Sequence, residues 1–349
     1  MVHTGIIVAL LFSFLFPLEF EVEPYLQSAT PNSIFILWET DSNADTRVEW
    51  GTSTFLGNNT SGTAFYNYGN SQIHTVLLDG LNPDTRYYYR AVTSNLSSEI
   101  YDFITPADPE SESSLKIIAM SDIQKDWSNW DKYDEIIHEG IMDYLTDEYS
   151  DDLPQELQMV LIAGDLVDTG SNYSHWTGHF FAPSTPLFAH VPLYTVLGNH
   201  EANTSYYFNY FNLPQNGSTG YEEHWWFTDN SNLRVIGLDS NWDFQLDVQL
   251  NWLEDVLADA CYNPQIDFVF AQLHHPYHSE LWIDGNTDYT GDVITLMEAF
   301  TDECGKPSIH FFGHTHGYSR GQSQDHEHLM VNVATAGGAI DYWGEWAQT

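Results

Sequence analysis

Hydrophobic and polar residues alternate in short runs over the N-terminal part of the chain, from Phe20 to about Thr105. Turn residues separate the runs, and none of them shows the 3.6-residue period of an amphipathic helix. The pattern predicts a small all-β sandwich over residues 20–106, with strands in SIFILWETD, TRVEWG, the segment from His74 to Thr93, and EIYDFIT. Nothing in these strands distinguishes a carbohydrate-binding or partner-binding module from a rigid spacer.

The turn LNPDT at residues 81–85, followed by Tyr87 and Tyr89, resembles the tyrosine corner of fibronectin type III domains. In that motif a Tyr hydroxyl binds the backbone at a sharp strand crossing. The resemblance implies a fibronectin III-like sandwich. In such a sandwich the Trp and Tyr side chains of this region form the core and the corner instead of a ligand platform.

A different pattern begins at Leu115, after a polar segment that predicts an interdomain linker over residues 107–114. Very apolar runs alternate with helical stretches from there on: LKIIAM, MVLIAG, PLYTVLG, LRVIGLD, FVFAQL, IHFFG and HLMVNVA. Such runs predict strands buried on both faces, so we expect residues 115–349 to form an α/β domain of central β-sheets flanked by helices. Helices are expected at 130–149, 247–260 and 292–304. Because the chain stops soon after Gly338, we expect this domain to lack its final strands.

The N-terminus carries an apolar run, IIVALLFSFLFPL, from Ile6 to Leu18. The run is shorter than a membrane span and contains Pro17, which predicts a signal peptide over residues 1–19 and a secreted, extracellular or periplasmic protein. The residues before it lack Lys and Arg, so a buried strand remains the alternative. No later stretch is apolar enough to cross a bilayer, and no stable membrane insertion is expected.

Fifty acidic residues face only nine Lys and Arg, which gives a formal net charge of -41. A surface this acidic repels nucleic acid and anionic membranes, so neither is an expected partner. The only cysteines, Cys261 and Cys304, each end a predicted helix just before a predicted strand. A disulfide between them and two free buried thiols are both compatible with that placement.

Five of the predicted strands end in the same way, with Asp, Asn or His directly after the last apolar residue. Because the carboxyl ends of the strands of an α/β sheet line one crevice, we expect these side chains to meet in one pocket. The residues concerned are Asp122, Asp165, Asn199, His200, His274, His314 and His316.

Carboxylates and imidazoles packed together are costly unless cations lie between them. The set therefore predicts a metal centre, and its mixed oxygen and nitrogen donors suit Fe, Zn, Mn or Co. An Asp, for which we choose Asp165, can bridge two metals about 3.5 to 4 Å apart, and such a pair holds a hydroxide at neutral pH. His275 is the alternative to His274, because adjacent side chains of an extended chain point in opposite directions.

Together these residues resemble the calcineurin-like metallophosphoesterases, and with the preceding sandwich they are most similar to the purple acid phosphatase branch. The resemblance implies two divalent or trivalent metal ions (Fe, Zn or Mn). It also implies that His200, beside Asn199, faces the phosphate and assists the leaving group, so that His200 and Asp165 are the catalytic residues. The metal ligands that it implies are Asp122 and His316 on the first metal, Asp165 between the two, and Asn199, His274 and His314 on the second.

Two positions depart from the purple enzymes. Those enzymes have Gly two residues after the first Asp and Tyr three residues after the bridging Asp, where this chain has Gln124 and Asp168. A Tyr phenolate stabilises ferric iron and gives the colour, so its absence implies a colourless enzyme with divalent metals. We expect Gln124 to offer its carbonyl oxygen as a further metal ligand.

The resulting hypothesis is a secreted phosphatase that hydrolyses small phosphomonoesters by attack of a metal-bridging hydroxide. Asn199 and His200 are expected to contact the substrate, and His278 to join them from the pocket rim. The histidines that we rank below His278 for that contact are His175, His179, His326 and His328. A phosphodiesterase or nucleotide hydrolase of the same fold is the first alternative, and a non-catalytic cell-surface binding protein is the second.

Overall fold

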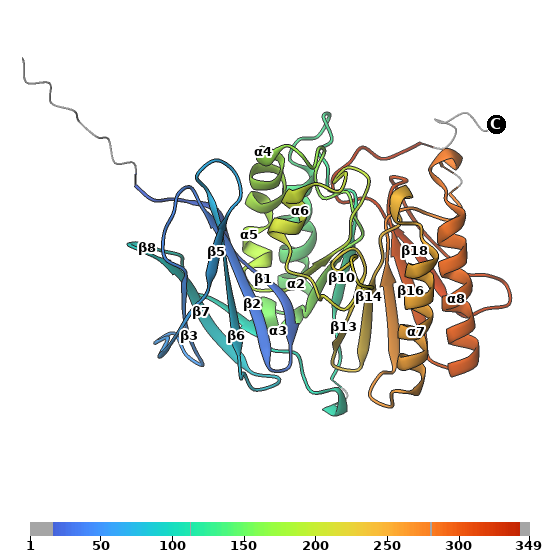
Figure 1. The fold of residues 1–349 in the computed structure, drawn as a ribbon, viewed down its shortest axis with the longest axis horizontal. Coiled ribbons are helices and arrows are strands. Elements are labelled where there is room, and N and C mark those ends of the chain that lie inside the picture. Colours follow the sequence, from blue (N-terminus) through green and yellow to red (C-terminus); the bar gives the residue numbers. More distant parts are fainter. Residues whose placement is uncertain (1–16, 112, 280, 343–349) are drawn as a thin grey trace, which may run out of the picture.

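The computed structural model describes residues 17–111, 113–279 and 281–342, which form two units of different architecture (Figure 1). The apolar run predicted to direct export lies outside these residues except for Pro17 and Leu18. Across the described ranges, no helix combines the length and the apolar character that a membrane span requires.

The N-terminal unit is built from strands alone, as the alternating pattern predicts. One sheet has the strand order β1-β2-β6-β5, and the other has the order β4-β3-β7-β8 with β9 paired to β7. Trp38, Val76 and Phe103 are buried in the core of this unit. The strands are β1 (Phe20–Thr30), β2 (Ser33–Thr40), β3 (Arg47–Gly51), β4 (Asn58–Ser61), β5 (Thr63–Tyr66), β6 (Gln72–Asp79), β7 (Arg86–Thr93), β8 (Leu96–Ser97) and β9 (Tyr101–Ile104).

The turn between β6 and β7 has the hydrogen bond expected of a tyrosine corner. The backbone N–H of Asn82 donates to the Tyr87 hydroxyl at 2.9 Å. Tyr87 and Tyr89 are both buried in the core. The two aromatic rings therefore stabilise the sandwich, as the sequence predicts, instead of presenting a surface to a ligand.

The C-terminal unit contains the α/β pattern, and each of the seven apolar runs named above forms a strand. Its strands are β10 (Ile117–Met120), β11 (Met159–Ile162), β12 (Leu193–Thr195), β13 (Trp226–Asn230), β14 (Leu233–Gly237), β15 (Phe268–Gln272), β16 (Ser308–Phe312), β17 (Tyr318–Gly321) and β18 (Leu329–Val333). Its helical segments are α1 (Lys132–Glu135), η2 (Ile136–Asp143), α2 (Tyr144–Glu148), α3 (Leu153–Glu156), α4 (Tyr173–His175), η3 (Trp176–Phe181), α5 (Ala182–Phe188), α6 (Ser205–Tyr210), α7 (Asp247–Tyr262) and α8 (Asp288–Cys304). Short 3-10 turns occur at η1 (Pro109–Ser111), η4 (Trp242–Phe244) and η5 (Ile283–Gly285).

The strands of the C-terminal unit belong to two sheets. β10, β11 and β12 run parallel, and β12 continues in parallel onto β1 of the N-terminal unit, with Gln27 opposite Leu193. The second sheet has the order β13-β14-β15-β16-β18-β17. Side chains of both sheets, among them Leu161, Trp226 and Val235, share one buried core. The strand ends expected to meet at the edge of one sheet therefore belong to two sheets that share a core.

The predicted linker does not separate the two units in space. Besides the shared sheet, the Tyr25 hydroxyl donates to the backbone carbonyl of Tyr210 at 2.8 Å. The Tyr89 hydroxyl donates to the carbonyl of Ala189, also at 2.8 Å. The N-terminal sandwich therefore acts as a fixed extension of the first sheet in this structure.

Two of the three predicted helices, α7 and α8, lie where the periodicity places them. They pack together on the outer face of the second sheet (Figure 1). The third prediction, 130–149, corresponds to a continuous helical stretch whose middle, η2, is a π-helix. The helical segment 173–188 was not predicted, because Gly178 and two prolines interrupt its sequence pattern. Its aromatic residues Trp176 and Phe180 are fully buried, so tertiary packing stabilises it.

Cys261 and Cys304 are disulfide-bonded, with their Cα atoms 5.4 Å apart. The bond joins α7 to α8, which precede the neighbouring strands β15 and β16. Of the two states compatible with the sequence, the structure therefore has the disulfide.

Candidate metal centre

The polar residues singled out in the sequence lie at the carboxyl ends of five strands, where the two sheets meet. The first sheet contributes oxygen donors and the second contributes imidazoles. Asp122 follows β10, Asp165 follows β11, Asn199 follows β12, His274 follows β15, and His314 and His316 follow β16.

Three of these residues have a left-handed backbone. The φ angle is +60° at Asp122, +52° at Asp165 and +70° at His314. Such a conformation costs a non-glycine residue on the order of 1–3 kcal/mol and persists only where the surroundings enforce it. Here the three residues adopt it within two or three residues of a strand end, where the donor loops begin.

Two glycines allow the donor loops to approach one another closely. A Cβ atom on Gly198 would lie 2.2 Å from a carboxylate oxygen of Asp165. A Cβ atom on Gly313 would lie at the same distance from a carboxylate oxygen of Asp122. The glycines of the GNHE and GHTH motifs are therefore required by the packing of the cluster itself.

Half of the cluster centres on His274. Its Nε2 atom lies 3.1 Å from Asp165 Oδ2 and 3.1 Å from Asn199 Oδ1. The Nδ1 atom of His314 lies 3.3 Å from the same nitrogen. Donors around one tetrahedral metal at about 2.0–2.1 Å are about 3.4 Å apart, so these four atoms have the spacing of a shared cation.

The other half centres on His316, whose Nε2 atom lies 3.1 Å from Asp122 Oδ1. The amide nitrogen of Gln124 lies 3.0 Å from that imidazole nitrogen. The amide oxygen of Gln124 is buried and has no hydrogen-bond partner. Gln124 therefore has an unused oxygen donor next to His316, which fits the role that the sequence assigns to it.

The orientation of the imidazoles shows that cations fit this cluster. His274 Nδ1 lies 2.9 Å from the carbonyl of Ala163, and His316 Nδ1 lies 2.6 Å from the carbonyl of Ala339. A carbonyl only accepts, so each Nδ1 carries a proton and each Nε2 is the atom that faces the cluster and can bind a cation there. Carboxylate and amide oxygens direct lone pairs to the same places. Positive charge, as a metal ion or as a proton on Nε2, makes such an arrangement favourable.

The pKa values of His274 and His316 show that the cluster favours positive charge. Burial lowers the pKa of His274, but the carboxylates of Asp165 and Asp122 outweigh it and raise that pKa to about 10. Burial also lowers the pKa of His316, and the hydrogen bond to Asp122 raises it to about 9. Burial and the charge on His274 lower the pKa of His314 to about 2.

His200 lies at the open side of the cluster, with about a third of its side chain exposed. Its Nδ1 donates to the backbone carbonyl of Asp168 at 2.8 Å, and its Nε2 lies 3.8 Å from Asp165 Oδ2. Its backbone N–H donates to the other carboxylate oxygen of Asp165 at 2.9 Å. The structure thus brings His200 next to the cluster with one ring nitrogen available.

Glu201 is a functional residue that the sequence reasoning missed. It is fully buried, and its carboxylate accepts hydrogen bonds from the backbone N–H groups of Asp165 at 2.9 Å, Leu166 at 2.8 Å and Gly198 at 2.8 Å. Burial and the nearby charge of Asp165 raise the pKa of Glu201 to about 7. Glu201 ties the loop after β11 to the loop after β12. Its place inside the GNHE motif was the only sequence signal for this role.

His275, the alternative to its neighbour, points elsewhere. Its Nδ1 atom lies 2.9 Å from the Ser240 hydroxyl. The structure thus brings His274, and not His275, against Asp165 and Asn199.

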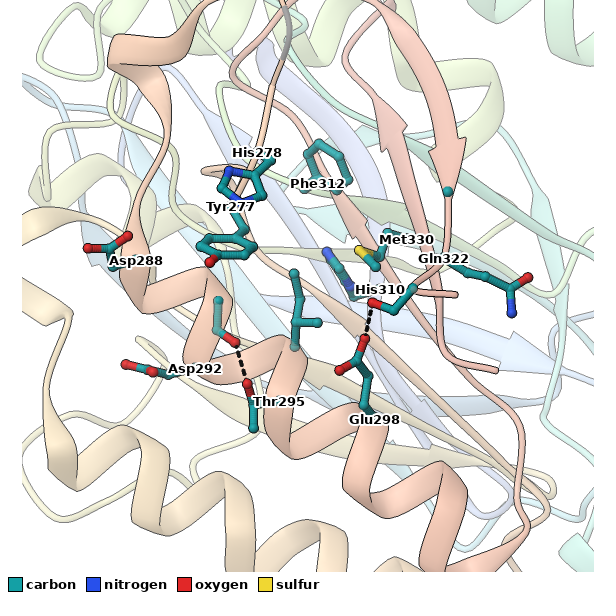
Figure 2. A pocket seen from close by; sticks show the side chains of 14 residues that line it. Tyr277, His278, Asp288, Asp292, Thr295, Glu298, His310, Phe312, Gln322 and Met330 are labelled. Atoms are coloured by element: carbon teal, nitrogen blue, oxygen red, sulfur yellow. Dashed lines mark hydrogen bonds between the residues drawn. The ribbon is translucent and has the colours of Figure 1, made fainter. Parts of the chain in front are cut away.

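His278 lines two cavities of the C-terminal unit. It lines a cavity of about 610 Å³ together with Tyr277, Asp288 and Glu298 (Figure 2). The fourteen residues that line this cavity include none of the six predicted ligands that follow the strands. The second cavity, of about 500 Å³, is also lined by Thr315, the residue between His314 and His316. A substrate contact by His278 stays a prediction.

Of the remaining histidines, two also have partners away from the cluster. His326 pairs with Asp302 at 2.7 Å. His328 is buried between His310 and Ser308.

A cavity that the sequence reasoning did not anticipate lies beside the cluster, and we call it the mixed-charge cavity because both signs of charge line it. Its lining residues include Lys125, Lys132 and His179, the carboxylates of Asp126, Asp131 and Asp134, and Ile123, the residue after Asp122. Lys132 donates to the backbone carbonyl of Gly338, and Lys125 lies over the Trp130 ring. Two lysines so close to Asp122 in a chain with nine basic residues were the available signal.

The fold and the cluster define a class: an α/β domain that gathers carboxylate, amide and imidazole donors at its strand ends, as metallophosphoesterases do. Residues 115–318 match the family model described as calcineurin-like phosphoesterase, and the chain belongs to that family. Residues 21–105 match the purple acid phosphatase N-terminal domain. The family resemblance seen in the sequence is confirmed.

Curated relatives and solved structures agree with this membership. The chain is 26% identical to probable purple acid phosphatase 20 of Arabidopsis thaliana, over 86% of this chain and 69% of the relative. It is 23% identical to Fe(3+)-Zn(2+) purple acid phosphatase 12 of the same plant, over 74% of this chain and 54% of the relative. It is 22% identical to the phosphoenolpyruvate phosphatase of Allium cepa, over 75% of this chain and 53% of the relative. The chain thus spans only about half the length of the last two.

Among solved structures, the purple acid phosphatase PPD1 from yellow lupin (Lupinus luteus) is similar with a TM-score of 0.73 at 18% identity, over 93% of this chain and 66% of that chain. A structure of PhoD has a TM-score of 0.67 at 11% identity, over 91% of this chain and 77% of that chain. These similarities confirm the predicted fold class.

Proposed function

We propose that the protein is a dinuclear metal-dependent phosphatase that hydrolyses small phosphomonoesters. The observation that carries the proposal is the convergence of lone pairs from both sheets on two places, one at His274 and one at His316. The residues that would hold the cations are Asp122, Gln124, Asp165, Asn199, His274, His314 and His316. Bound there, two cations polarise the phosphoryl group and lower the pKa of water enough to generate a nucleophile near neutral pH.

The chain contributes positioning and proton transfer. Asp165 is proposed as the bridging carboxylate, because its Oδ2 lies 3.1 Å from His274 Nε2 and its charge also acts on Asp122. The Asp168 carbonyl holds Nδ1 of His200, which leaves Nε2 of the partly exposed ring 3.8 Å from Asp165 Oδ2. From there a protonated His200 can donate to the oxygen of the departing alcohol.

The metal ions of the proposed centre would give a phosphate ester a local attraction. The protein as a whole carries a net charge of -41, which repels such an ester, but distant carboxylates are screened by salt beyond about 10 Å at 0.1 M. Lys125 and Lys132 lie beside the cluster, and Asp126, Asp131 and Asp134 line the same cavity and offset their charge. The attraction therefore depends on bound metal.

Export is part of the proposal. The apolar N-terminal run supports it, and so does the Cys261–Cys304 disulfide, because such bonds persist in oxidising compartments. Divalent metals, and hence a colourless protein, are proposed because Asp168 stands where a Tyr ligand would be needed for ferric iron.

The test is a comparison of initial rates with a nitrophenyl monophosphate, the corresponding bis-ester and phosphoenolpyruvate, the substrate in the name of one relative. Each is assayed with Zn²⁺, Mn²⁺ or Fe²⁺ and again after chelation. We expect the monoester to react fastest and the activity to disappear on chelation. Faster turnover of the bis-ester would replace the proposal with a phosphodiesterase. Less than about one bound metal per chain together with no hydrolysis would favour a non-catalytic protein.

A further inference from the structure

A second group of metal-type donors lies behind His200, and no step of the proposed hydrolysis uses it. Asp168 comes from the loop after β11, His175 ends α4, and His179 lies in η3. One donor atom from each of the three lies within 4.8 Å of the others. Asp168 is also the position where the resemblance to the purple enzymes would require a Tyr ligand. Here its side chain faces two imidazoles instead.

The spacing of the donors suits one cation. Asp168 Oδ2 lies 3.3 Å from His179 Nδ1 and 3.8 Å from His175 Nδ1. Ligands around a tetrahedral zinc at about 2.0–2.1 Å are about 3.4 Å apart. The two histidines are four residues apart in a helical segment and so project from the same face, an arrangement that zinc proteins use.

The group is poorly satisfied by its own hydrogen bonds. A single carboxylate oxygen faces two imidazole nitrogens, and it is too far from His175 for a hydrogen bond. His175 Nδ1 is buried and has no hydrogen-bond partner. An unsatisfied buried polar atom costs about 1–3 kcal/mol, and a cation between the three groups would remove that cost. The imidazole rings are stacked with their centroids 4.5 Å apart, so protonating both would be unfavourable.

The side chains of this group are less exposed to solvent than those of an ordinary surface ion pair. The side chains of Asp168, His175 and His179 are 15%, 16% and 21% exposed. His179 also lines the mixed-charge cavity of about 290 Å³, which offers an entry path. Lys125 is close enough to act on His179 electrostatically, and its charge opposes a bound cation. The net charge of -41 acts in the opposite direction.

We propose that Asp168, His175 and His179 bind a third metal ion, separate from the dinuclear centre. One carboxylate and two imidazoles suit a borderline transition metal such as Zn²⁺, with water as the fourth ligand. Because the Asp168 carbonyl holds His200 Nδ1, this ion would fix the loop that orients His200. The ion is a structural support in this role and not a participant in the hydrolysis.

The experiment counts zinc per chain after dialysis against Zn²⁺ in a large excess of Mg²⁺, which occupies weak surface carboxylates. The probe is Zn²⁺ alone, and the variants are wild type, H175Q/H179Q and the matched control H138Q, which alters an exposed histidine beside Asp134. We expect a fall of one zinc per chain in the double variant and no change in the control. An unchanged count in the folded double variant would overturn the proposal.

Two further measurements distinguish loss of this site from damage elsewhere in the protein. In a D165N background the dinuclear centre is damaged, and the difference of one zinc between the chains with and without H175Q/H179Q should persist. If the double variant does not fold, D168N serves in its place, with at least a tenfold weaker binding of one zinc expected and unchanged affinity counting against the site. Neither arm depends on phosphatase activity, so this inference and the proposed function can fail separately.

Discussion

The two sheets of the C-terminal unit contribute different chemistry to the same site. The ends of β10, β11 and β12 supply oxygen donors, and the ends of β15 and β16 supply imidazoles. Glu201 supports the oxygen side by holding two of its loops. The imidazole of His274 is oriented across the interface, by the Ala163 carbonyl at the end of β11. The comparison shows that neither sheet holds a complete site. The first sheet supplies the negative charge of the carboxylates, and the second sheet supplies most of the nitrogen donors.

The largest expected effect is on the oxygen side, at Asp165. Asp165→Asn keeps the shape of the side chain and removes the charge that both halves of the cluster share. We expect kcat/KM for the monoester to fall about 10³-fold or more, since metal activation supplies several kcal/mol and each 1.4 kcal/mol is a factor of ten. The rate is to be measured with metal content determined on the same sample. A loss of less than tenfold would remove Asp165 from the bridging position.

A smaller effect is expected on the imidazole side. His314→Ala removes one neutral donor from the half of the cluster around His274 and leaves the carboxylates in place. We expect a fall of about 10²-fold in kcat/KM, comparable to the loss of one stabilising donor at an active site. The loss should be partly reversed at high metal concentration. His326→Ala, which alters a histidine paired with Asp302, is the control and should change little. If His314→Ala is the more damaging change, the oxygen side does not dominate.

A substitution at Glu201 tests whether this residue holds the loops that carry the oxygen donors. Glu201→Gln replaces an acceptor of several backbone N–H groups with an amide that has only one oxygen. We expect metal affinity and kcat to fall about 10 to 100-fold, the usual cost of losing an outer support of a metal ligand. Metal titration distinguishes this from simple unfolding, because added metal should restore kcat in a folded variant. Full activity at low metal would mean that Glu201 does not position Asp165.

The smallest effect is expected at Gln124. Gln124→His gives the half of the cluster around His316 a further imidazole and so moves it toward the composition of the other half. We expect tighter binding of one metal and a change in kcat of less than about tenfold, because one neutral donor replaces another. Competition of Zn²⁺ against Mn²⁺ should shift toward Zn²⁺. An unaltered preference would place Gln124 outside the metal shell.

The parts of the structure that could be predicted from sequence are those encoded locally. The apolar strand runs, helices α7 and α8 and the tyrosine corner each depend on residues close together in the chain. The helical segment 173–188 could not be predicted, since burial of aromatic side chains such as Trp176 and Phe180 stabilises it against Gly178 and two prolines. The same holds for the disulfide, whose two states are equally compatible with the sequence.

The candidate site, too, could be predicted only in part. Residue types and their place after strand ends were enough to select the metal-type residues around Asp165. The sequence did not reveal that two sheets meet there, that Glu201 joins the loops after β11 and β12, or that Asp168 faces His175 and His179. The pairing of β12 with β1 and the cavities that His278 lines were likewise undetermined.

The sequence by itself determined which side-chain atoms are available as metal donors, because the residue types and the strand ends depend on short stretches of consecutive residues. The tertiary structure alone decided which of those atoms converge, since distances between loops depend on how the two sheets pack. It also decided in which direction each imidazole presents its lone pair, because backbone carbonyls from distant segments fix the tautomers.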